Sequence, residues 1–234
     1  MRFVLNNIPG VQTLLKRWKQ RHVTSIEKQL MQKYPQATMY SQIGADFWVL
    51  ETLDFLREGF FVDVGAHNGI DLSNTYMLEK EYGWNGICIE PNQKSFTVLQ
   101  NARNCTLSND CAYSTGNEVV DFLLPSTNAE LGGIRSHMDT HHPKGSIVTM
   151  RTKTLEQILE EHNAPLHIDY LTIDTEGSEY EILKVFPFQK YQISTISVEH
   201  NFEEPKRSNI FALLTNNGYR KERGVKFDDW YVHV

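Results

Sequence analysis

From about residue 48 onward, short apolar runs alternate with segments whose apolar residues recur at helical spacing. This alternation constrains the fold most, because strands joined by helices form parallel sheets covered by helices on both faces. The runs predict strands at 60–64, 86–90, 106–114, 168–174 and 193–201, and the other segments predict helices at 71–82, 93–103, 154–162, 179–186 and 207–218. The sequence therefore predicts an open, doubly wound α/β sheet.

The end of the chain, residues 219–234, contains two strand-like runs around Gly224 and predicts a hairpin that completes the sheet. Gly218 is the predicted stop of the preceding helix. The chain has 234 residues, of which 40% are apolar, and it shows no internal repeat. It is therefore large enough for one well-buried domain with a short appendage.

Ligands of such sheets bind at the carboxyl ends of the strands. Four of the five predicted strands end in a carboxylate there, although acids also favour helix N-termini for structural reasons. The residues at this edge are Asp63, Gly65 and Gly69; Glu90, Pro91 and Asn92; Asp110 and Ala112; Asp174, Glu176 and Gly177; and Glu199, His200 and Asn201. Their concentration at one edge predicts a binding site.

The glycine-rich turn after the first strand, "FFVDVGAHNGI", indicates the kind of ligand. Its glycines, Gly65 and Gly69, have the spacing G-x-x-x-G, which differs from the G-x-G-x-x-G of dinucleotide sites. The carboxylate of Asp63 would repel a phosphate but suits an ammonium group. Glu90, at the end of the second strand, can accept hydrogen bonds from both ribose hydroxyls. A ligand with a ribose, a positive charge and no phosphate fits S-adenosylmethionine, and this predicts methyl transfer.

The charge and the cysteines restrict the partners and the compartment. A formal net charge of −6 argues against a nucleic-acid partner. The three cysteines are odd in number and lack metal-type spacing, so we expect reduced core residues of a cytoplasmic protein. No apolar run has the length of a membrane span, and the N-terminus has no signal-peptide core.

The motifs of the chain resemble those of the FkbM-type family of S-adenosylmethionine-dependent methyltransferases. The resemblance covers roughly residues 40 to 232 and rests on "SQIGADFWVLE", "FVDVGAHNGI", "GICIEPN", "IDYLTIDTEGSEYEIL", "ISVEHN" and "FDDWYV". The most specific motif is a strand followed by D-x-E-G-x-E, here Asp174, Glu176, Gly177 and Glu179. The resemblance implies a methyltransferase domain over 41–234. The helix-like pattern before it predicts an N-terminal helical extension over 1–40.

The resemblance implies a Rossmann-like class I sheet of about seven strands whose last strand is antiparallel. It also implies O-methylation, often of sugars or of hydroxyls on natural products. In the cofactor site, the glycine turn surrounds the methionine part, Glu90 holds the ribose, and Asp110 lies near the adenine. The full set of cofactor-binding residues that we expect is Gln42, Asp63, Gly65, Ala66, His67, Asn68, Gly69, Glu90, Pro91, Asn92, Asp110, Ala112 and Asp174.

Methyl transfer to oxygen requires a group that aligns the hydroxyl and removes its proton. We expect Asp174 and His200 to flank the acceptor hydroxyl, with Glu176 orienting it. A structural alternative for His200 is a partly buried histidine that a backbone partner satisfies. For Glu179 we expect a surface or helix N-terminal carboxylate rather than a catalytic group.

A metal-assisted variant uses the same region. The oxygen ligands that magnesium or calcium could take are Asp174, Glu176, Glu199 and Asn201. Clustered carboxylates also suit a general base without a metal, because each raises the pKa of its neighbours. We expect that no metal is required.

The polar segment 125–146 predicts an irregular acceptor-binding loop in which Arg135 and the histidines bind sugar hydroxyls. Its histidines, His137, His141 and His142, have no suitably spaced partner for zinc. Three alternatives stay open: a nicotinamide-dependent oxidoreductase, a binding module without activity, and a methyltransferase acting on a small metabolite or protein. The helix-like stretch 11–34 is expected to cover one face of the domain, or to bind a membrane surface or partner.

Overall fold

The computed structural model describes residue 32 and the ranges 39–138 and 144–234. The chain divides into two compact units, Met1–Thr38 and Met39–Val234. In the first unit only Gln32, which is helical, belongs to the described residues. Apart from Gln32, the predicted helix over 11–34 therefore lies outside them. The same holds for the extension 1–40, apart from Gln32 and its last two residues, and for His141 and His142.

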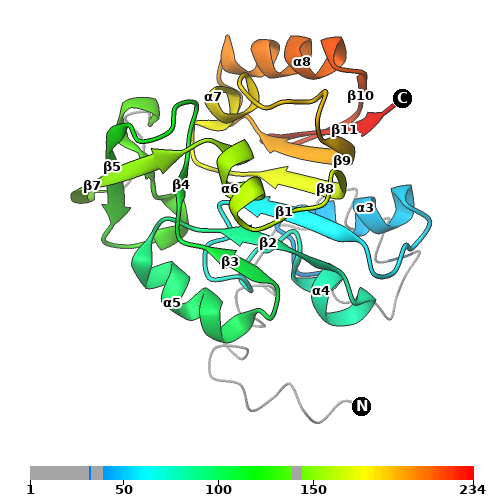
Figure 1. Cartoon of the computed structure of the whole chain (residues 1–234), viewed down its shortest axis with the longest axis horizontal. Coiled ribbons are helices and arrows are strands. Elements are labelled where there is room, and N and C mark those ends of the chain that lie inside the picture. The colour runs from blue at the N-terminus through cyan, green and yellow to red at the C-terminus, as the bar shows by residue number, and fades with distance from the viewer. Residues whose placement is uncertain (1–31, 33–38, 139–143) are drawn as a thin grey trace. The chain divides into compact units, whose positions relative to one another are not determined.

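The main sheet of the second unit has seven strands, as the resemblance implied (Figure 1). Neighbouring strands pair in parallel from β3 to β9, and β11 is antiparallel to both of its neighbours. In spatial order the strands are β10 (Tyr219–Val225), β11 (Asp228–His233), β9 (Gln192–Glu199), β8 (His167–Ile173), β1 (Phe60–Val64), β2 (Asn85–Ile89) and β3 (Thr106–Ser108). The predicted doubly wound α/β fold with an antiparallel last strand is confirmed.

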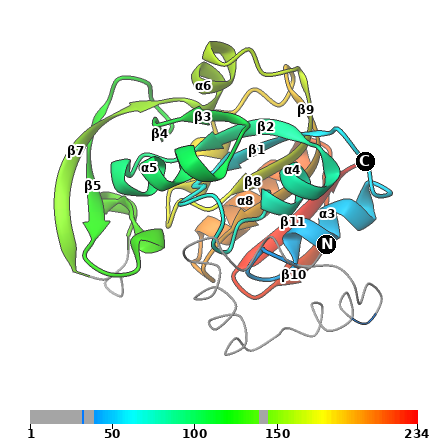
Figure 2. The ribbon, with the colours of Figure 1, turned by 90° about the horizontal axis from the view of Figure 1, so that it is seen from below.

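Alternation along the strands directs side chains to two helical layers. Val62 and Val64 point into a core shared with α6 (Leu155–Glu161), α7 (Glu179–Leu183) and α8 (Lys206–Asn216). Phe61 points to the other face, where Arg103 contacts its ring. The helices of that face are α3 (Ala45–Thr52), α4 (Tyr76–Tyr82) and α5 (Gln93–Ala102). Figure 2 shows α6 and α3 on opposite sides of the sheet.

A second, smaller sheet lies at one end of the main sheet, on the left in Figures 1 and 2. Its strands, in spatial order, are β4 (Cys111–Ala112), β7 (Gly145–Lys153), β5 (Val119–Pro125) and β6 (Gly133–Ile134). The single strand predicted over 106–114 is therefore wrong: it divides into β3 in the main sheet and β4 in the second. The connection from β5 to β7 is also not wholly irregular, since it contains η2 (Ala129–Leu131), β6 and η3 (Arg135–His137).

Two predicted boundaries are wrong because polar side chains and pairing override local propensity. The helix predicted from 71 begins only at Tyr76, because Asn68 Oδ1 accepts the N–H groups of Ile70 and Asp71 and holds them in a turn. The terminal hairpin turns at residues 226–227, whereas Gly224 lies inside β10 and pairs with Asp229.

The three cysteines are free and buried, as expected for core residues. Cys88 Sγ lies 3.6 Å from Cys105 Sγ. Within the described ranges, every helix is too short or too polar to pass through a bilayer.

Candidate active site

Two adjoining cavities open at the carboxyl ends of the parallel strands, as expected for this sheet. Gly65, His67, Glu130 and Asp174 line both. The Glu90 cavity, as we call the first, is also lined by Val64, Ile89, Glu90, Pro91, Asn92, Asp110, Cys111, Ala112, Phe122, Ala129, Gly132, Ile134, Thr175 and Ser178. The acidic cavity has a volume of about 270 Å³ and is also lined by Gln42, Ile43, Asp63, Ala66, Asp71, Leu72, Ser73, Asn74, Leu131, Glu176, Glu199, Asn201, Phe227 and Asp228.

Gly65 lines both cavities, at a position where only glycine fits the backbone. Its φ angle is +95°, and a Cβ built there would lie 1.8 Å from the carbonyl oxygen of Asp174. The N–H groups of Gly65 and Ala66 both donate to the carbonyl of Ile89, at 3.0 Å each. The turn is thus fixed between β2 and β8 and exposes bare backbone to the cavities.

Asp63 lies at the buried floor of the acidic cavity. Its Oδ2 accepts a hydrogen bond of 2.6 Å from Thr75 Oγ1, and Thr75 Oγ1 also accepts one of 3.0 Å from Arg103. Burial raises the pKa of Asp63, and the Thr75 hydroxyl and the Arg103 charge oppose this shift. Arg103 also forms an ion pair with Glu79, at 2.5 Å, so Glu79 neutralises much of the charge of Arg103.

Glu90 is held by the backbone of the two loops beside it. Its Oε2 accepts the N–H of His67 at 2.8 Å, and its Oε1 accepts the N–H of Asn92 at 2.7 Å. His67 reaches this position with a φ of +48°. Burial raises the pKa of Glu90 to about 7, although both backbone donors oppose the shift. Each oxygen keeps a lone pair that can accept a ligand hydroxyl.

The lining of the Glu90 cavity also combines an acid with apolar side chains. Asp110 accepts a hydrogen bond of 2.6 Å from Ser108 Oγ and lies 3.1 Å from Lys153 Nζ. Phe122 and Ile134, from the second sheet, complete this lining. An apolar slot with a carboxylate at its end suits a flat heteroaromatic ring with an amino group.

Eleven of the thirteen predicted cofactor residues line these cavities. Asn68 and Gly69 line neither. Asn68 instead caps its own turn, and a Cβ at Gly69, whose φ is +75°, would lie 2.4 Å from Leu99 Cδ1. Both residues therefore shape the loop without facing the cavities.

Three carboxylates converge in the acidic cavity. Asp174, Glu176 and Glu199 each offer one oxygen, and these three oxygens lie within 4.8 Å of one another. Burial, followed by the charges of neighbouring acids, raises the pKa of both Asp174 and Glu199. Asp174 and Glu176, from the predicted catalytic set, therefore lie together.

His200 does not join them. Its side chain is 1% exposed and lines neither cavity. Nδ1 accepts the N–H of Phe202 at 2.9 Å, and Nε2 lies 3.4 Å from Asp229 Oδ1. The ring has the backbone partner that the structural alternative anticipated, and the geometry does not support its placement beside the acceptor hydroxyl.

Glu179 begins α7, so of the two expected forms, a surface or a helix N-terminal carboxylate, the structure has the second. Its side chain is fully buried. Oε1 accepts the N–H groups of Thr175 and Gly177, both at 2.9 Å, and Oε2 lies 3.1 Å from Lys206 Nζ. Glu179 thus holds the loop that carries Asp174 and Glu176.

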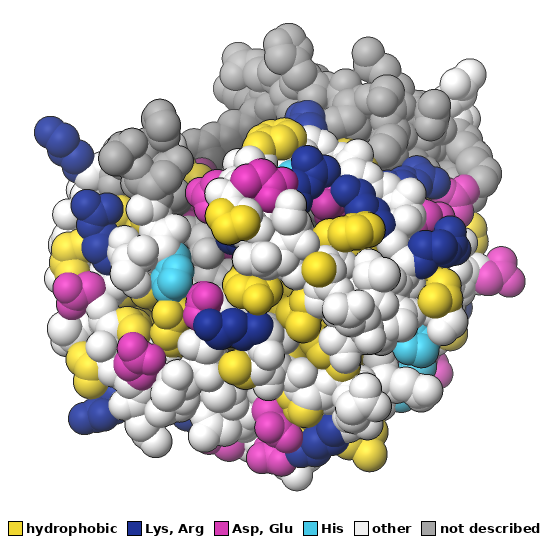
Figure 3. Space-filling view, turned by 90° about the horizontal axis from the view of Figure 1, so that it is seen from above, with side chains coloured by type: hydrophobic (Ala, Val, Ile, Leu, Met, Phe, Trp, Pro, Cys, Tyr) yellow, Lys and Arg dark blue, Asp and Glu magenta, His cyan; other side chains and the backbone are white. Residues whose placement is uncertain are grey.

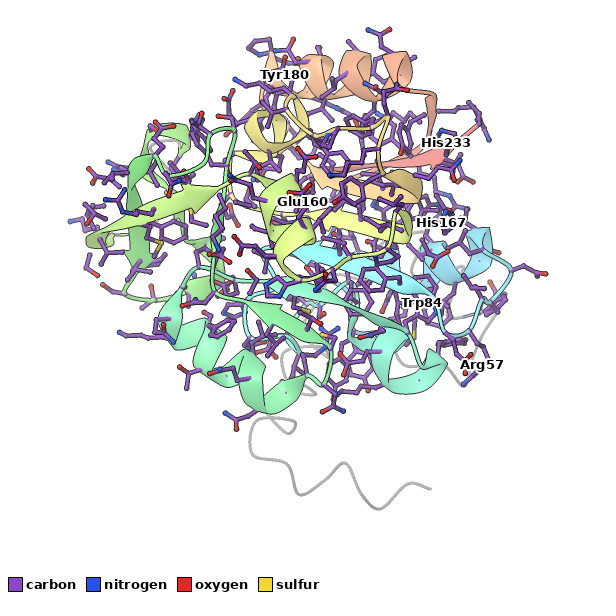
Figure 4. All side chains as sticks on the ribbon, viewed as in Figure 1. Arg57, Trp84, Glu160, His167, Tyr180 and His233 are labelled. Atoms are coloured by element: carbon purple, nitrogen blue, oxygen red, sulfur yellow. The ribbon has the colours of Figure 1, made fainter. Side chains whose placement is uncertain are left out.

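Several lining residues were not found from the sequence. Glu130 and Leu131 come from η2, where the sequence showed only a polar segment, and Thr175 and Ser178 lie within the D-x-E-G-x-E motif without having been singled out. Asp228 could have been singled out from the sequence, because it belongs to the motif "FDDWYV". Two other histidines, His167 and His233, lie at the opposite end of the sheet, on the right in Figure 4.

The sheet order, the glycine turn and an acid after β2 together define a class I methyltransferase. The family model described as "Methyltransferase FkbM domain" matches residues 63–221, and the chain belongs to the FkbM methyltransferase family. This family implies S-adenosylmethionine as the methyl donor. A comparison with curated proteins gave no match.

Solved structures similar to this chain include three methyltransferases. A precorrin-6y C5,15-methyltransferase from Geobacter metallireducens is 11% identical, with a TM-score of 0.46, over 84% of this chain and 90% of that one. A methyltransferase FkbM from Methylobacillus flagellatus is 16% identical, with a TM-score of 0.45, over 76% of this chain and 44% of that one. A putative RNA methyltransferase from Pyrococcus horikoshii is 10% identical, with a TM-score of 0.44, over 91% and 100%.

Proposed function

We propose that this protein is an S-adenosylmethionine-dependent O-methyltransferase that acts on a hydroxyl of a sugar or glycan. The observation that carries the proposal is the charge of the paired cavities. Seven carboxylates line the acidic cavity, and among the described residues no lysine or arginine lines either cavity. A cationic, phosphate-free nucleoside suits such walls, whereas the pyrophosphate of a nicotinamide cofactor does not.

The cofactor extends across the Gly65 turn in this proposal. The adenine lies in the Glu90 cavity near Asp110, and the ribose hydroxyls donate to Glu90. The sulfonium lies beside Asp174, and the methionine amino group lies near Asp63 and Gln42. The carboxylates of Asp63 and Asp174 stabilise the positive charges of the cofactor. The turn at Gly65 lets the protein backbone approach the cofactor closely.

The acceptor hydroxyl attacks the methyl group from the acidic cavity. Its oxygen forms the new C–O bond as the C–S bond breaks, which releases S-adenosylhomocysteine, and Asp174 takes the hydroxyl proton. Burial and the neighbouring Glu176 raise the pKa of Asp174, so its carboxylate is a stronger base than an exposed one. Glu176 lines the same cavity and orients the hydroxyl.

A sugar acceptor is favoured by the polar lining of the acidic cavity. Gln42, Asn74 and Asn201 offer amide groups beside the carboxylates, and sugar hydroxyls both donate to and accept from such groups. Glu130 and Leu131 also line it, which supports an acceptor-binding role for the segment 125–146. A small metabolite or a protein hydroxyl is the alternative acceptor. A cytoplasmic location is part of the proposal, because the three cysteines are free and buried.

A nucleic-acid acceptor is not part of the proposal. On the face shown in Figure 3, basic and acidic side chains of the described residues are mixed. The whole chain carries a formal net charge of −6. Binding to a phosphate backbone depends on concentrated positive charge.

The proposal is tested by incubating the chain with methyl-labelled S-adenosylmethionine and a panel of sugars and glycans, followed by mass spectrometry. We expect a mass increase of one methyl group on an acceptor hydroxyl and none without the chain. Calorimetric titration with S-adenosylhomocysteine is expected to saturate at one site, and NADH is expected to give no heat. NADH binding without S-adenosylhomocysteine binding would overturn the cofactor assignment, and binding without transfer to any hydroxyl would favour a binding module.

A further inference from the structure

We propose that the side chain of Phe202 is a stacking surface for the acceptor, and that it contacts the sugar ring next to the one that is methylated. Phe202 belongs to the loop after β9, and its side chain is 64% exposed. The residue before it, Asn201, lines the acidic cavity. This inference rests on the proposed function and makes it narrower, because it names the acceptor as a glycan of at least two rings.

The backbone of Phe202 has a conformation that bulky residues rarely adopt. Its φ angle is +58°, directly after a φ of +48° at Asn201. Asparagine tolerates the left-handed region, whereas phenylalanine is strained there. A single exposed apolar side chain is ordinary at a protein surface, but a strained one persists only where the surrounding structure enforces it. The strain therefore points to a use for the exposed ring.

Hydrogen bonds from four consecutive backbone N–H groups enforce this conformation. The N–H groups of His200 and Asn201 both donate to the carbonyl oxygen of Phe227, at 2.7 and 3.3 Å. The N–H of Phe202 donates to Nδ1 of His200 at 2.9 Å, and the N–H of Glu203 donates to the carbonyl of His200 at 2.9 Å. The loop thus holds the ring in place beforehand, which reduces the entropy that is lost when a ligand stacks on it.

His200 is a positioning residue in this arrangement. Because its Nδ1 accepts the N–H of Phe202, the proton of the neutral ring is on Nε2, which lies 3.4 Å from Asp229 Oδ1. Asp229 is held in turn by ion pairs with Arg207 and Lys221. The rings of His200 and Phe202 also contact each other edge to face, with their centroids 5.4 Å apart. A fully buried histidine therefore supports both the backbone and the ring of Phe202.

The place of Phe202 beside the acidic cavity decides which part of the acceptor it contacts. In the proposed function this cavity takes the reacting sugar, and the half-buried Phe227 lines it. Phe202 lines neither cavity, so a sugar ring on it belongs to the next unit. The C–H groups on one face of a pyranose ring stack on an aromatic ring. A single ring beside a polar cavity suits a glycan better than a lipid chain, which needs a continuous apolar surface.

The experiment measures methyl transfer to a panel of hexopyranoses, 6-deoxyhexopyranoses and pentopyranoses, each as the methyl glycoside, the phenyl glycoside and the homodisaccharide. For the sugar that is methylated, we expect kcat/KM to be about tenfold higher for the disaccharide than for the methyl glycoside, through KM. Phe202→Asn removes the ring and keeps a residue that tolerates a positive φ. It is expected to abolish this preference without lowering the melting temperature, whereas Phe202→Tyr should retain the preference. Phe211→Ala, which removes an exposed ring on α8, is the control and should also retain it.

Two variants of His200 test its positioning role. The side-chain oxygen of asparagine can accept the N–H of Phe202 in place of Nδ1, whereas leucine cannot. His200→Asn should therefore keep the preference for the disaccharide, and His200→Leu should raise the KM of the disaccharide more than it lowers kcat. Equal falls in kcat for both variants, with KM unchanged, would contradict a positioning role.

Binding is followed separately from turnover by NMR, on the chain labelled with ring-13C phenylalanine and saturated with S-adenosylhomocysteine. The signal of Phe202, identified by its loss in Phe202→Asn, is expected to shift when the disaccharides are added. Methyl transfer with a preference that Phe202→Asn retains, or with a preference for phenyl glycosides alone, overturns the stacking surface and leaves the proposed function standing. A shift of the Phe202 signal without transfer to any glycoside removes the proposed function and keeps the stacking surface. Absence of both removes both.

Discussion

The carbonyl oxygen of Asp174 occupies the place where a Cβ of residue 65 would be. A Cβ added to Gly65 would lie 1.8 Å from that oxygen, at a φ angle of +95°. The cofactor turn after β1 is therefore packed directly against the end of β8. Because Asp174 also faces both cavities, this contact sets the distance between the proposed methyl donor and the proposed base.

Gly65→Ala is expected to reduce both stability and cofactor binding. A left-handed alanine costs about 1–2 kcal/mol, and overlap with a backbone atom adds about 1–3 kcal/mol. Gly83→Ala is the matched control, since Gly83 also has a positive φ, +73°, but its nearest neighbouring atom is 4.0 Å away. Urea unfolding and S-adenosylhomocysteine titration measure both effects. Equal losses in the two variants would contradict the packing argument.

Glu90→Gln is expected to change how stability depends on pH. The folded pKa of Glu90, about 7, lies above the ordinary value of 4.5, so between these values the folded state binds more protons than the unfolded state. The contribution of Glu90 to stability is present below pH 4.5 and is lost as pH rises through about 7. The wild type should therefore lose stability relative to Glu90→Gln between pH 5 and pH 8, measured by urea unfolding.

Cofactor affinity should change in the opposite direction. Ionised Glu90 accepts both ribose hydroxyls in the proposal, so S-adenosylhomocysteine should bind the wild type more tightly as pH rises through about 7. This part of the pH dependence should be absent in Glu90→Gln, whose affinity we expect to be about tenfold to a hundredfold lower. Identical pH profiles for the two proteins would remove Glu90 from the ribose site.

Local sequence patterns were sufficient to predict much of the main sheet. The apolar run into Asp63, the glycine spacing and Glu90 all lie within one strand–helix–strand unit, so their arrangement follows from local rules. The pairing of β5 with β7 was missed, because its partners are twenty or more residues apart and seven of the sixteen residues in the two strands are exposed. Glu130 and Phe122 reached the site only through this pairing.

His200 and Asp228 show a second limit. His200 follows Glu199 directly, and successive side chains of an extended strand point to opposite faces, so only one of the two could face the cavity. Glu199 does, whereas the His200 ring is buried near Asp229. Asp228 reached the cavity through its register with Glu199 on a strand that is distant in sequence. Neither outcome can be obtained from a motif alone.

Asp174→Asn is expected to slow methyl transfer while leaving the binding of S-adenosylhomocysteine nearly intact, because this product has no sulfonium charge for Asp174 to stabilise. The amide keeps the shape of the carboxylate but cannot take the hydroxyl proton, so kcat should fall by about 10²–10⁴. In the wild type, the raised pKa of Asp174 should make kcat increase with pH above the usual carboxylate range. Asp63→Ala is the contrasting variant, with a loss mainly in affinity for S-adenosylhomocysteine. Full turnover by Asp174→Asn on the true acceptor would exclude Asp174 as the base.

Glu179→Ala is expected to be one of the most destabilising single changes near the site. It leaves two backbone N–H groups, of Thr175 and Gly177, without their acceptor and leaves the half-buried Lys206 with one partner fewer. Removing one member of a buried ion pair typically costs about 3–5 kcal/mol. The matched control is Glu181→Ala in the same helix, whose ion pair with Lys184 is at the surface and contributes less than about 1 kcal/mol.

The mechanism of this loss can be separated from a general loss of packing. Lys206→Met in the Glu179→Ala background should restore part of the stability, because it removes a charge that has lost its buried partner and keeps only Glu203. Hydrogen exchange at Thr175 and Gly177 should stay fast in the double variant, because their acceptor is still missing. If exchange there stayed slow in Glu179→Ala, the carboxylate would not be what holds the Asp174 loop, and the fixed position of Asp174 would need another cause.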